Sequence, residues 1–276
     1  MTTTISIDGE LVPFERATIS IFDRGFLYGD GVFEVLRTWH GVAVDLDAHL
    51  DRLYATARAL ALRTIDRGAL AASVRATIAA AGAGDHRVRV VITRGAGPIG
   101  ARFAELPRGR AIVIVEPLPE LPSELALAIV DWPLPRRTGP GTKTLAYLDH
   151  AIARELAAAA GADEAIRLDA GGFVAECATA NLFVVAGGAV ATPPLDAGVL
   201  PGVTRARVLA ACARLGIVAH ERQITVGELA AADELFATSA VRGIVPVTRL
   251  DGTARAPGSI TKQIATEYLR SLTVES

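Results

Sequence analysis

Lysine and cysteine are among the scarcest residue types in this sequence. Of the 28 basic residues in a chain of 276, only Lys143 and Lys262 are lysines and the rest are arginines. The two cysteines, Cys177 and Cys212, are too few for a disulfide framework and lack the paired spacing of a zinc site. No run of eighteen apolar residues occurs, and the opening MTTTISIDGE lacks the basic and apolar stretches of a signal peptide. We therefore expect a cytoplasmic protein with no membrane span.

An excess of one charge is also lacking, because 28 basic residues balance 30 acidic ones to a net charge of −2. Without a basic stripe, the chain has no electrostatic surface for nucleic acid or for an anionic membrane. The motifs G-x-S-x-G, H-E-x-x-H and C-x-x-C are absent, so triad hydrolysis and zinc catalysis lose their usual sequence support. We expect small molecules and copies of the chain itself as partners, and no metal site.

Apolar residues are abundant, at 51% of the chain, and they follow both helical and strand periods. This pattern predicts an α/β (α+β) protein with a large core. Up to the proline-rich stretch at 116–124, we expect strands in 1–22, 31–46, 86–95 and 109–118, and helices at 48–62 and 67–82. Beyond it we expect strands at 126–133, in 162–192 and at 234–238, and helices at 145–160, 202–215, 225–231 and around Ile260, Ile264 and Tyr268. The predicted domains are a small N-terminal one at 1–117, a linker at 118–126 and a larger C-terminal one at 127–276.

One Gly-rich string, GAGPIG at 95–100, fits the G-x-G-x-x-G pattern of a dinucleotide-binding turn and follows a predicted strand. Such a turn should open a helix, yet Pro98 lies inside it and Pro107 follows soon after. No suitably placed acidic residue ends a second strand either. We interpret the string as a glycine-rich loop that lines some other cleft.

The two lysines differ in their settings. Lys262 lies off the apolar face of its predicted helix, which is typical of a solvated charge. Lys143 follows a Pro/Gly loop and directly precedes an apolar helix start, LAYL. Because desolvation penalises an ammonium ion, apolar neighbours favour the neutral lysine amine, which is the form that reacts to an imine. Arginine cannot form an imine, because its guanidinium stays protonated. Lys143 is therefore a candidate for covalent catalysis, the alternative being one lysine left by chance and codon bias.

Glu176 is the second unusual charge, because it lies in the apolar or small-residue stretch FVAECATANLFVV. A carboxylate in such a strand needs a cation or a hydrogen-bond donor. One interpretation is a salt bridge to one of the many arginines. The other is a carboxylate that holds a protonated pyridine nitrogen, the charge that makes pyridoxal phosphate an electron sink.

Two segments are suited to hold a phosphate. LPGVTRARVL runs from Pro-Gly into a predicted helix, so the amides of Val203 and Thr204 and the Thr204 hydroxyl would face an anion at the positive end of the helix dipole. FATSAV places Thr238 and Ser239 just beyond a strand end, where ligand loops often lie. Each segment alone is a common feature, but together with Arg52 of HLDRLY they predict a phosphate site.

In order and spacing, seven strings resemble the fold-type IV (class IV) family of PLP-dependent aminotransferases. This family includes D-amino acid aminotransferases, branched-chain aminotransferases and aminodeoxychorismate lyases. The strings span nearly the whole chain: DRGFLYGDGVFEVLRTWHG, HLDRLY, VVITRG, KTLAYLDHAIARELA, ADEAIRLDAGGFVAECATANLFVV, LPGVTRARVL and DELFATSAVRGIVPVTRLDG. The resemblance implies a two-domain fold-type IV enzyme that uses pyridoxal 5'-phosphate to move an amino group between an amino acid and a 2-keto acid. It also implies a homodimer whose loops complete each other's sites.

The resemblance assigns roles to individual residues as well. It implies that Lys143 forms the imine with the cofactor and then carries a proton between substrate and cofactor carbons, and that Glu176 pairs with the pyridine nitrogen. The residues implied to hold the phosphate are Arg52, Val203, Thr204, Thr238 and Ser239, with Asn181 nearby. The substrate is implied to lie between the domains, near Phe33, Arg37, Arg89 and the backbone of Ala240 and Val241.

The sequence departs from the family where substrates are selected. Branched-chain enzymes often have Tyr-x-Arg on a strand where this chain keeps Arg89 but has Arg87 in place of the tyrosine. D-amino acid enzymes often have Arg-x-His where this chain has Ile99 and Ala101. Neither of the family's carboxylate traps is intact.

Other positions favour a transaminase. Strand alternation puts Arg37 on the face of Phe33, so Arg37 and Arg89 are candidates for binding a substrate carboxylate, unless both are solvated strand charges. FATS resembles D-amino acid enzymes, and FEV resembles transaminases rather than lyases. We expect a D-amino acid or branched-chain transaminase, with the lyase and a non-catalytic binding protein of the same fold as alternatives.

Overall fold

The computed structural model of this chain describes residues 3–135 and 141–274. The chain forms two compact units. The first unit consists of Met1–Glu120 and the short segment Thr142–Tyr147, and the second of Leu121–Gly141 and Leu148–Glu275. Most of the Pro/Gly loop predicted before Lys143 lies outside the described residues. The division into domains at 118–126 stays a prediction.

Among the described residues, the first unit contains one antiparallel sheet of six strands in the order β2-β1-β6-β5-β3-β4. Its strands are β1 (Thr4–Ile7), β2 (Glu10–Val12), β3 (Gly31–Trp39), β4 (Val42–Ala43), β5 (His86–Thr93) and β6 (Ala111–Pro117). Its helices are α1 (Arg24–Tyr28), α2 (Leu46–Ala59) and α3 (Arg67–Ala81), with short 3-10 turns at Phe14–Arg16 and Phe103–Glu105.

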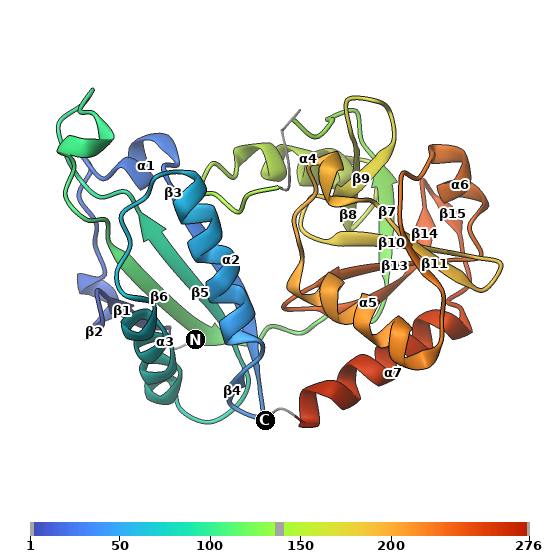
Figure 1. Cartoon of the computed structure of the whole chain (residues 1–276), viewed down its shortest axis with the longest axis horizontal. Coiled ribbons are helices and arrows are strands. Elements are labelled where there is room, and N and C mark those ends of the chain that lie inside the picture. Colours follow the sequence, from blue (N-terminus) through green and yellow to red (C-terminus); the bar gives the residue numbers. More distant parts are fainter. Residues whose placement is uncertain (1–2, 136–140, 275–276) are drawn as a thin grey trace. The chain divides into compact units, whose positions relative to one another are not determined.

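Helices α2 and α3 pack on one face of this sheet (Figure 1). Each has one apolar side, and Leu53 of α2 and Val74 of α3 are buried in the core that they share with the strands. Asp66 starts α3 by accepting a hydrogen bond from the Ala69 amide at 3.0 Å. Strand alternation places Phe33 on the other face of the sheet, away from both helices.

Among its described residues, the second unit contains a nine-stranded mixed sheet in the order β12-β11-β10-β13-β14-β7-β8-β9, with β15 beside β14. Its strands are β7 (Leu125–Ile129), β8 (Glu164–Leu168), β9 (Val174–Cys177), β10 (Asn181–Ala186), β11 (Ala189–Thr192), β12 (Ala219–Glu221), β13 (Glu234–Ser239), β14 (Gly243–Leu250) and β15 (Thr253–Ala254). Its helices are α4 (Leu148–Ala159), α5 (Val203–Leu215), α6 (Val226–Ala231) and α7 (Ser259–Val274), with a 3-10 turn at Leu195–Ala197.

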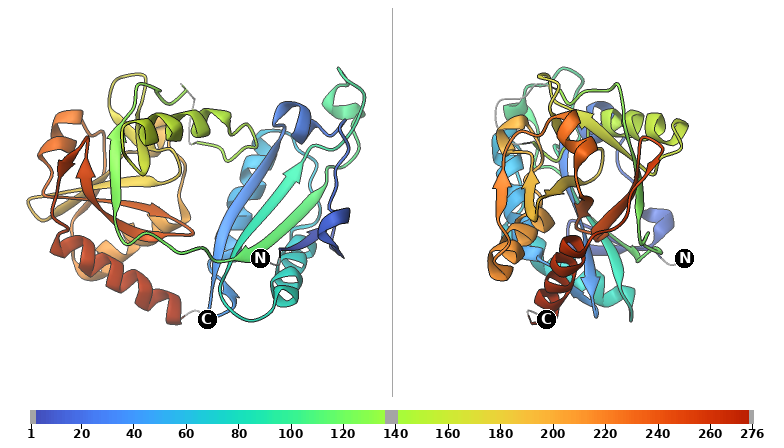
Figure 2. Two further views of the ribbon diagram at one scale, coloured as in Figure 1. Left: turned by 180° about the vertical axis from the view of Figure 1, so that it is seen from behind. Right: turned by 90° about the vertical axis from the view of Figure 1, so that its right-hand side faces the viewer.

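Separate apolar layers fix these helices to the sheet. Helices α5 and α7, the latter in red in Figure 2, pack against Phe183 and Phe236. The two phenyl rings stack with centroids 4.8 Å apart. Helix α4 packs on β8 through Ala153 and Ala157, which are fully buried. These contacts fix α4 to the part of the sheet that carries Glu176.

The structure corrects two expected elements and adds α1, β12, β14 and β15, which were not expected. Helix α4 begins at Leu148 rather than near 145, because Lys143–Tyr147 runs beside β3 instead. The expected strand over FVAECATANLFVV is two strands, β9 and β10, which do not pair directly in the sheet order. Strand β14 has no counterpart among the expected elements, because the proline at its centre argues against a strand.

Other features bear on the function classes considered above. None of the described helices is long and apolar enough to cross a membrane. Cys177 and Cys212 are free and buried. No group of metal-ligating side chains suited to an ion occurs among the described residues. After GAGPIG the chain forms only a three-residue 3-10 turn, as befits a loop rather than a dinucleotide-binding helix start.

Candidate active site

The backbone around Lys143 pairs with the first residues of β3. The Phe33 amide donates to the Lys143 carbonyl at 3.1 Å, and the Leu145 amide donates to the Gly31 carbonyl at 3.0 Å. Val32 and Thr144 form the antiparallel bridge between them. Lys143 is therefore fixed by a strand-like pairing in the first unit rather than by the helix that follows it.

The Lys143 side chain lies among aromatic and cationic groups. Its Nζ lies 4.6 Å from the centre of the Phe33 ring, and the Arg89 guanidinium carbon lies 4.1 Å from the same ring. Tyr147 meets Phe33 edge-on, with centroids 5.8 Å apart. Phe33 itself is only 3% exposed. The first unit thus gathers an amine, a guanidinium and a phenol around one buried aromatic ring.

Arg89 and Arg37 lie on the same face of the sheet but differ in their surroundings. Burial lowers the pKa of the Arg89 guanidinium, and the nearby charge of Arg87 acts in the same direction. Arg37 forms an ion pair with Asp85 at 3.6 Å, and its Nε donates to the Thr38 carbonyl. It lies four residues from Phe33, about 13 Å along the strand. The structure therefore groups Arg89 with Lys143 but does not group Arg37 with them.

Arg52 is held by a buried carboxylate in the first unit. Its Nε and a terminal nitrogen donate to the two oxygens of Glu34 at 2.7 and 2.6 Å, and His49 Nδ1 lies 2.8 Å from the second oxygen. Burial alone would raise the pKa of Glu34, but the hydrogen bonds and charges of Arg52 and His49 outweigh it and lower the pKa to about 2. This forked pair fixes the orientation of the guanidinium.

In the second unit, Glu176 is bound by the loop that precedes α5. The Leu200 amide donates to the Glu176 carboxylate at 2.9 Å, and the Asn181 side-chain nitrogen donates to the Leu200 carbonyl at 2.9 Å and to the same carboxylate at 3.4 Å. Glu176 is 7% exposed. Both of these neutral donors bond to the same carboxylate oxygen of Glu176.

The same region has the properties of an anion site. Thr238 lies opposite Asn181 in the β10–β13 ladder, and its buried hydroxyl oxygen has no hydrogen-bond partner among the described residues. Gly202 starts α5 without a side-chain cap, and Thr204 in the first turn is buried. A Cβ at position 202 would lie 2.0 Å from the Asn181 side-chain oxygen. An unpartnered hydroxyl beside an uncapped helix start fits a phosphate group.

The turn between β13 and β14 carries the remaining predicted residues. Ser239 ends β13, and its hydroxyl oxygen accepts hydrogen bonds from the backbone and Nε nitrogens of Arg242. Ala240 and Val241 form the turn and are half-buried. The second unit thus brings Ser239 and Thr238 onto one strand end.

Some residues of these sites escaped the sequence analysis. Tyr147 belonged to an expected helix, and its place beside Phe33 follows from a pairing distant in sequence. Arg167 is fully buried, and its terminal nitrogen lies 2.6 Å from Asp149 at the start of α4. Arg167 also pairs opposite Glu176 in the β8–β9 ladder. The single positive charge within the apolar strand of EAIRLD was the available signal.

Comparison with known proteins agrees with this geometry. Residues 31–250 match the family described as amino-transferase class IV. A protein of Methanocaldococcus jannaschii with the provisional name branched-chain-amino-acid aminotransferase is 35% identical, covering 96% of this chain and 94% of its own. D-alanine aminotransferase of Bacillus licheniformis is 29% identical over 99% and 98% of the two chains.

Solved structures give the same assignment. A branched-chain amino acid aminotransferase from T.th., complexed with N-(5'-phosphopyridoxyl)-L-glutamate, superposes with a TM-score of 0.91 at 26% identity. The match covers 99% of this chain and 95% of that one. The fold is that of a fold-type IV aminotransferase. The chain belongs to the class IV aminotransferase family.

Proposed function

We propose that this aminotransferase attaches pyridoxal 5'-phosphate, the cofactor of its family, through Lys143. It transfers amino groups between an amino acid and a 2-keto acid of the branched-chain or D-amino acid type. The observation that carries the proposal is the group of Lys143, Phe33 and Arg89 around one buried ring. The two relatives described above are named branched-chain-amino-acid aminotransferase and D-alanine aminotransferase, and these names support both substrate types.

The residues of each unit divide the work. When bound, the cofactor withdraws electrons from the carbon that carries the substrate amino group. Lys143 supplies the amine that holds the cofactor and, once released, takes the proton from that carbon at Nζ. Arg89 binds the substrate carboxylate, and Phe33 keeps water from the reacting atoms. The backbone of Ala240 and Val241 completes the substrate site.

The second unit supplies the polar anchors for the cofactor. Glu176 would accept the hydrogen of the ring nitrogen, because one of its oxygens is already held by the Leu200 amide and the Asn181 side chain. The residues that would hold the phosphate, as the family resemblance implies, are Val203, Thr204, Thr238, Ser239 and Arg52. The Thr238 hydroxyl, which has no partner in the part of the chain that the structure describes, supports this assignment most directly.

Borohydride trapping followed by peptide mass mapping tests the lysine. The reduced cofactor should be found on Lys143, and Lys143→Ala should lose it while Lys262→Ala, a change at an exposed helix position, should keep it. A label on Lys262 contradicts the assignment. A panel of D- and L-amino acids with pyruvate or 2-oxoglutarate then identifies the donor, and with a donor alone one equivalent of keto acid per site should appear. Pyruvate release from aminodeoxychorismate without any amino transfer would point to a lyase instead.

Replacement of Glu176 tests the ring-nitrogen contact. Glu176→Gln keeps the size and removes the charge, so the cofactor should stay bound while kcat falls about 100-fold, equivalent to about 3 kcal/mol. Glu116→Gln, which removes an exposed ion pair with Arg87, should leave kcat unchanged. Wild-type turnover in Glu176→Gln would mean that Glu176 is only a structural group.

We also propose a homodimer in the cytoplasm. Five large apolar side chains of the first unit are half or more exposed and lie in two segments that the Asp23–Ala96 bridge connects: Ile21 (69%), Phe22 (50%), Phe26 (65%), Ile99 (71%) and Phe103 (50%). A patch of this kind supports association with a second copy. The free thiols of Cys177 and Cys212 support a reducing compartment.

A further inference from the structure

The strand-like segment that carries Lys143 depends on two glycines of the first unit. A Cβ on Gly29 would lie 2.9 Å from the backbone nitrogen and Cα of Ala146. A Cβ on Gly31 would lie 2.6 Å from the Leu145 side chain and 2.6 Å from the Ile92 carbonyl oxygen. Such distances are shorter than real Cβ contacts, so any other residue at 29 or 31 must displace the segment or the sheet.

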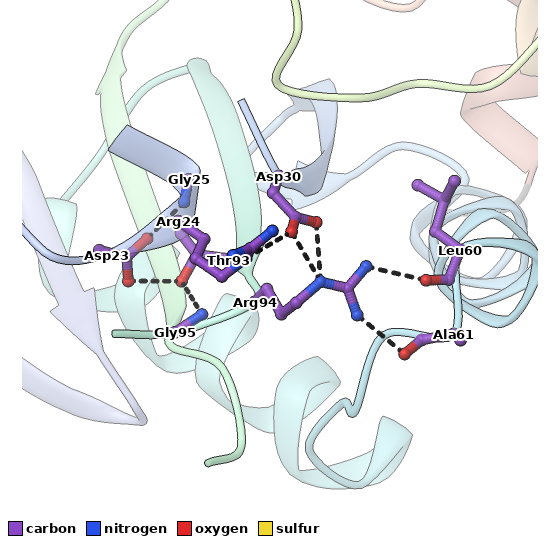
Figure 3. A network of polar contacts seen from close by, with 9 residues as sticks. All are labelled: Asp23, Arg24, Gly25, Asp30, Leu60, Ala61, Thr93, Arg94 and Gly95. Atoms are coloured by element: carbon purple, nitrogen blue, oxygen red, sulfur yellow. Dashed lines mark hydrogen bonds and ion pairs between the residues drawn. The ribbon is translucent and has the colours of Figure 1, made fainter. Parts of the chain in front are cut away.

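The residue between these glycines is held from several directions. Arg94 Nε lies 2.9 and 2.8 Å from the two Asp30 oxygens, and its backbone amide donates to the Asp30 carbonyl at 3.0 Å. Arg24 Nε donates to the same carboxylate at 2.9 Å (Figure 3). The guanidinium groups of Arg94 and Arg24 therefore leave the Asp30 side chain little freedom to move.

Arg94 is in turn fixed to the end of α2. Its terminal nitrogens donate to the Ala61 and Leu60 carbonyl oxygens at 2.9 and 2.8 Å, and the side chain is only 5% exposed (Figure 3). Asp23 and Thr93 add a second set of bonds beside it, at 2.8 Å between their side chains. The polar network thus connects the β3 start, the β5 end and α2.

We propose that Gly29, Asp30 and Gly31, fixed by Arg94, form a seat that positions the amine of Lys143. The inference deepens the proposed function and rests on Lys143 as the lysine that holds the cofactor. The glycines set how closely the segment approaches β3, and the arginine keeps the glycines in place. All four act through Lys143 and are positioning residues.

Paired variants separate this role from general stability. Gly29 and Gly41 both have positive φ, +63° and +81°, at the two ends of β3, but nothing lies within 4 Å of a Cβ at Gly41. Asparagine tolerates that conformation, so Gly29→Asn and Gly41→Asn differ mainly in the contact with the Lys143 segment. Amide exchange at Leu145, thermal unfolding and the pH dependence of Lys143 labelling are measured for both. The label is pyridoxal, added to apoenzyme and trapped with borohydride.

In Gly29→Asn, the Leu145 amide hydrogen should exchange at least tenfold faster than in wild type. The pH profile of Lys143 labelling should shift, and kcat should fall at least tenfold. Gly41→Asn should leave the Leu145 exchange rate and kcat within about twofold of wild type and the pH profile of labelling unshifted. Wild-type exchange and labelling in a folded Gly29→Asn overturn the seat. If that variant does not fold, Asp30→Asn replaces it, because it removes the charge without adding atoms. Wild-type amide exchange and Lys143 labelling in Asp30→Asn would overturn the proposal as well. Cofactor trapped on Lys262 in the wild type overturns the proposed function and the seat together, whereas trapping on Lys143 with unchanged exchange in the variants overturns the seat alone.

Discussion

At the scale of single residues, two similar side chains differ in whether they already have a charged partner. Arg37 and Arg89 both lie on the face of the first sheet that carries Phe33. Arg37 already has a carboxylate partner in Asp85, whereas burial lowers the pKa of Arg89, which contacts the Phe33 ring. A desolvated cation gains more from an incoming carboxylate than one that is already paired.

Alanine variants of these arginines should therefore differ. Arg89→Ala removes a charged contact worth about 1.5–3 kcal/mol, so the KM for the amino donor should rise about 10- to 100-fold with little loss of cofactor. Arg37→Ala is the matched control and should change the KM less than about threefold. Steady-state kinetics on both variants checks this, and a larger effect from Arg37 would reassign the carboxylate contact.

Glu34 predicts how stability depends on pH. Its pKa falls from an ordinary 4.5 to about 2 on folding, so it stabilises the native state above pH 4.5 and this contribution disappears as the pH falls toward 2. Between pH 6 and pH 3 the wild type should lose about 2 kcal/mol of unfolding free energy through this group alone.

Denaturant unfolding at several pH values measures that loss. In Glu34→Gln the group cannot titrate, so the variant should be less stable at pH 7 but show a correspondingly flatter decline in acid. Parallel declines in the two proteins would show that Glu34 does not keep its lowered pKa in solution.

At the scale of secondary-structure elements, local signals explain where several helices begin. Asp66 caps α3, and Thr225 caps α6 through a reciprocal bond with Glu228. Asp66→Ala should cost about 1 kcal/mol of unfolding free energy because the Ala69 amide loses its acceptor. Asp131→Ala, at an exposed position outside any helix, should cost much less, and chemical denaturation compares them.

The elements that sequence predicted well are those defined by local pattern. Helices α2, α3 and α5 lie within a few residues of their expected positions, because their apolar periods and boundaries are encoded in neighbouring residues. The start of α4 was wrong because the residues after Lys143 pair with β3, which lies more than a hundred positions earlier. Strand β14 was missed because the proline at its centre argues against a strand. The sheet tolerates Pro246 because pairing with β7 begins only at Val247.

The candidate site shows the same division. Lys143 and Glu176 stood out as rare charges in apolar surroundings, and Asn181 entered through the family pattern. The seat around Asp30 and the partners of Arg52 depend on contacts between segments far apart in the chain. No local pattern encodes them.

At the scale of the whole molecule, the exposed apolar patch predicts self-association. Wild-type protein should sediment at twice the 28.8 kDa mass of the chain, because a second copy would cover Ile21, Phe26 and Ile99. Phe26→Asp should shift the equilibrium toward the single chain. Val218→Asp, an equally drastic change at an exposed position of the second unit, should not. Analytical ultracentrifugation over a concentration series checks this, and an unaltered assembly in Phe26→Asp would place the interface elsewhere.

The path of the chain between its two units limits which crossovers between related genes give a working protein. The chain leaves the first unit after Glu120, returns for Thr142–Tyr147 and leaves it again, while the Gly141 amide donates to Val199 of the second unit at 2.8 Å. A gene segment that encodes residues 1–120 therefore specifies the β3 surface without the lysine fitted to it. A single crossover between diverged relatives near that boundary would join the glycine pair of one parent to the lysine segment of the other. The two parts must consequently change together, so Gly29 and Gly31 should co-vary with residues 145–146 rather than with their own neighbours.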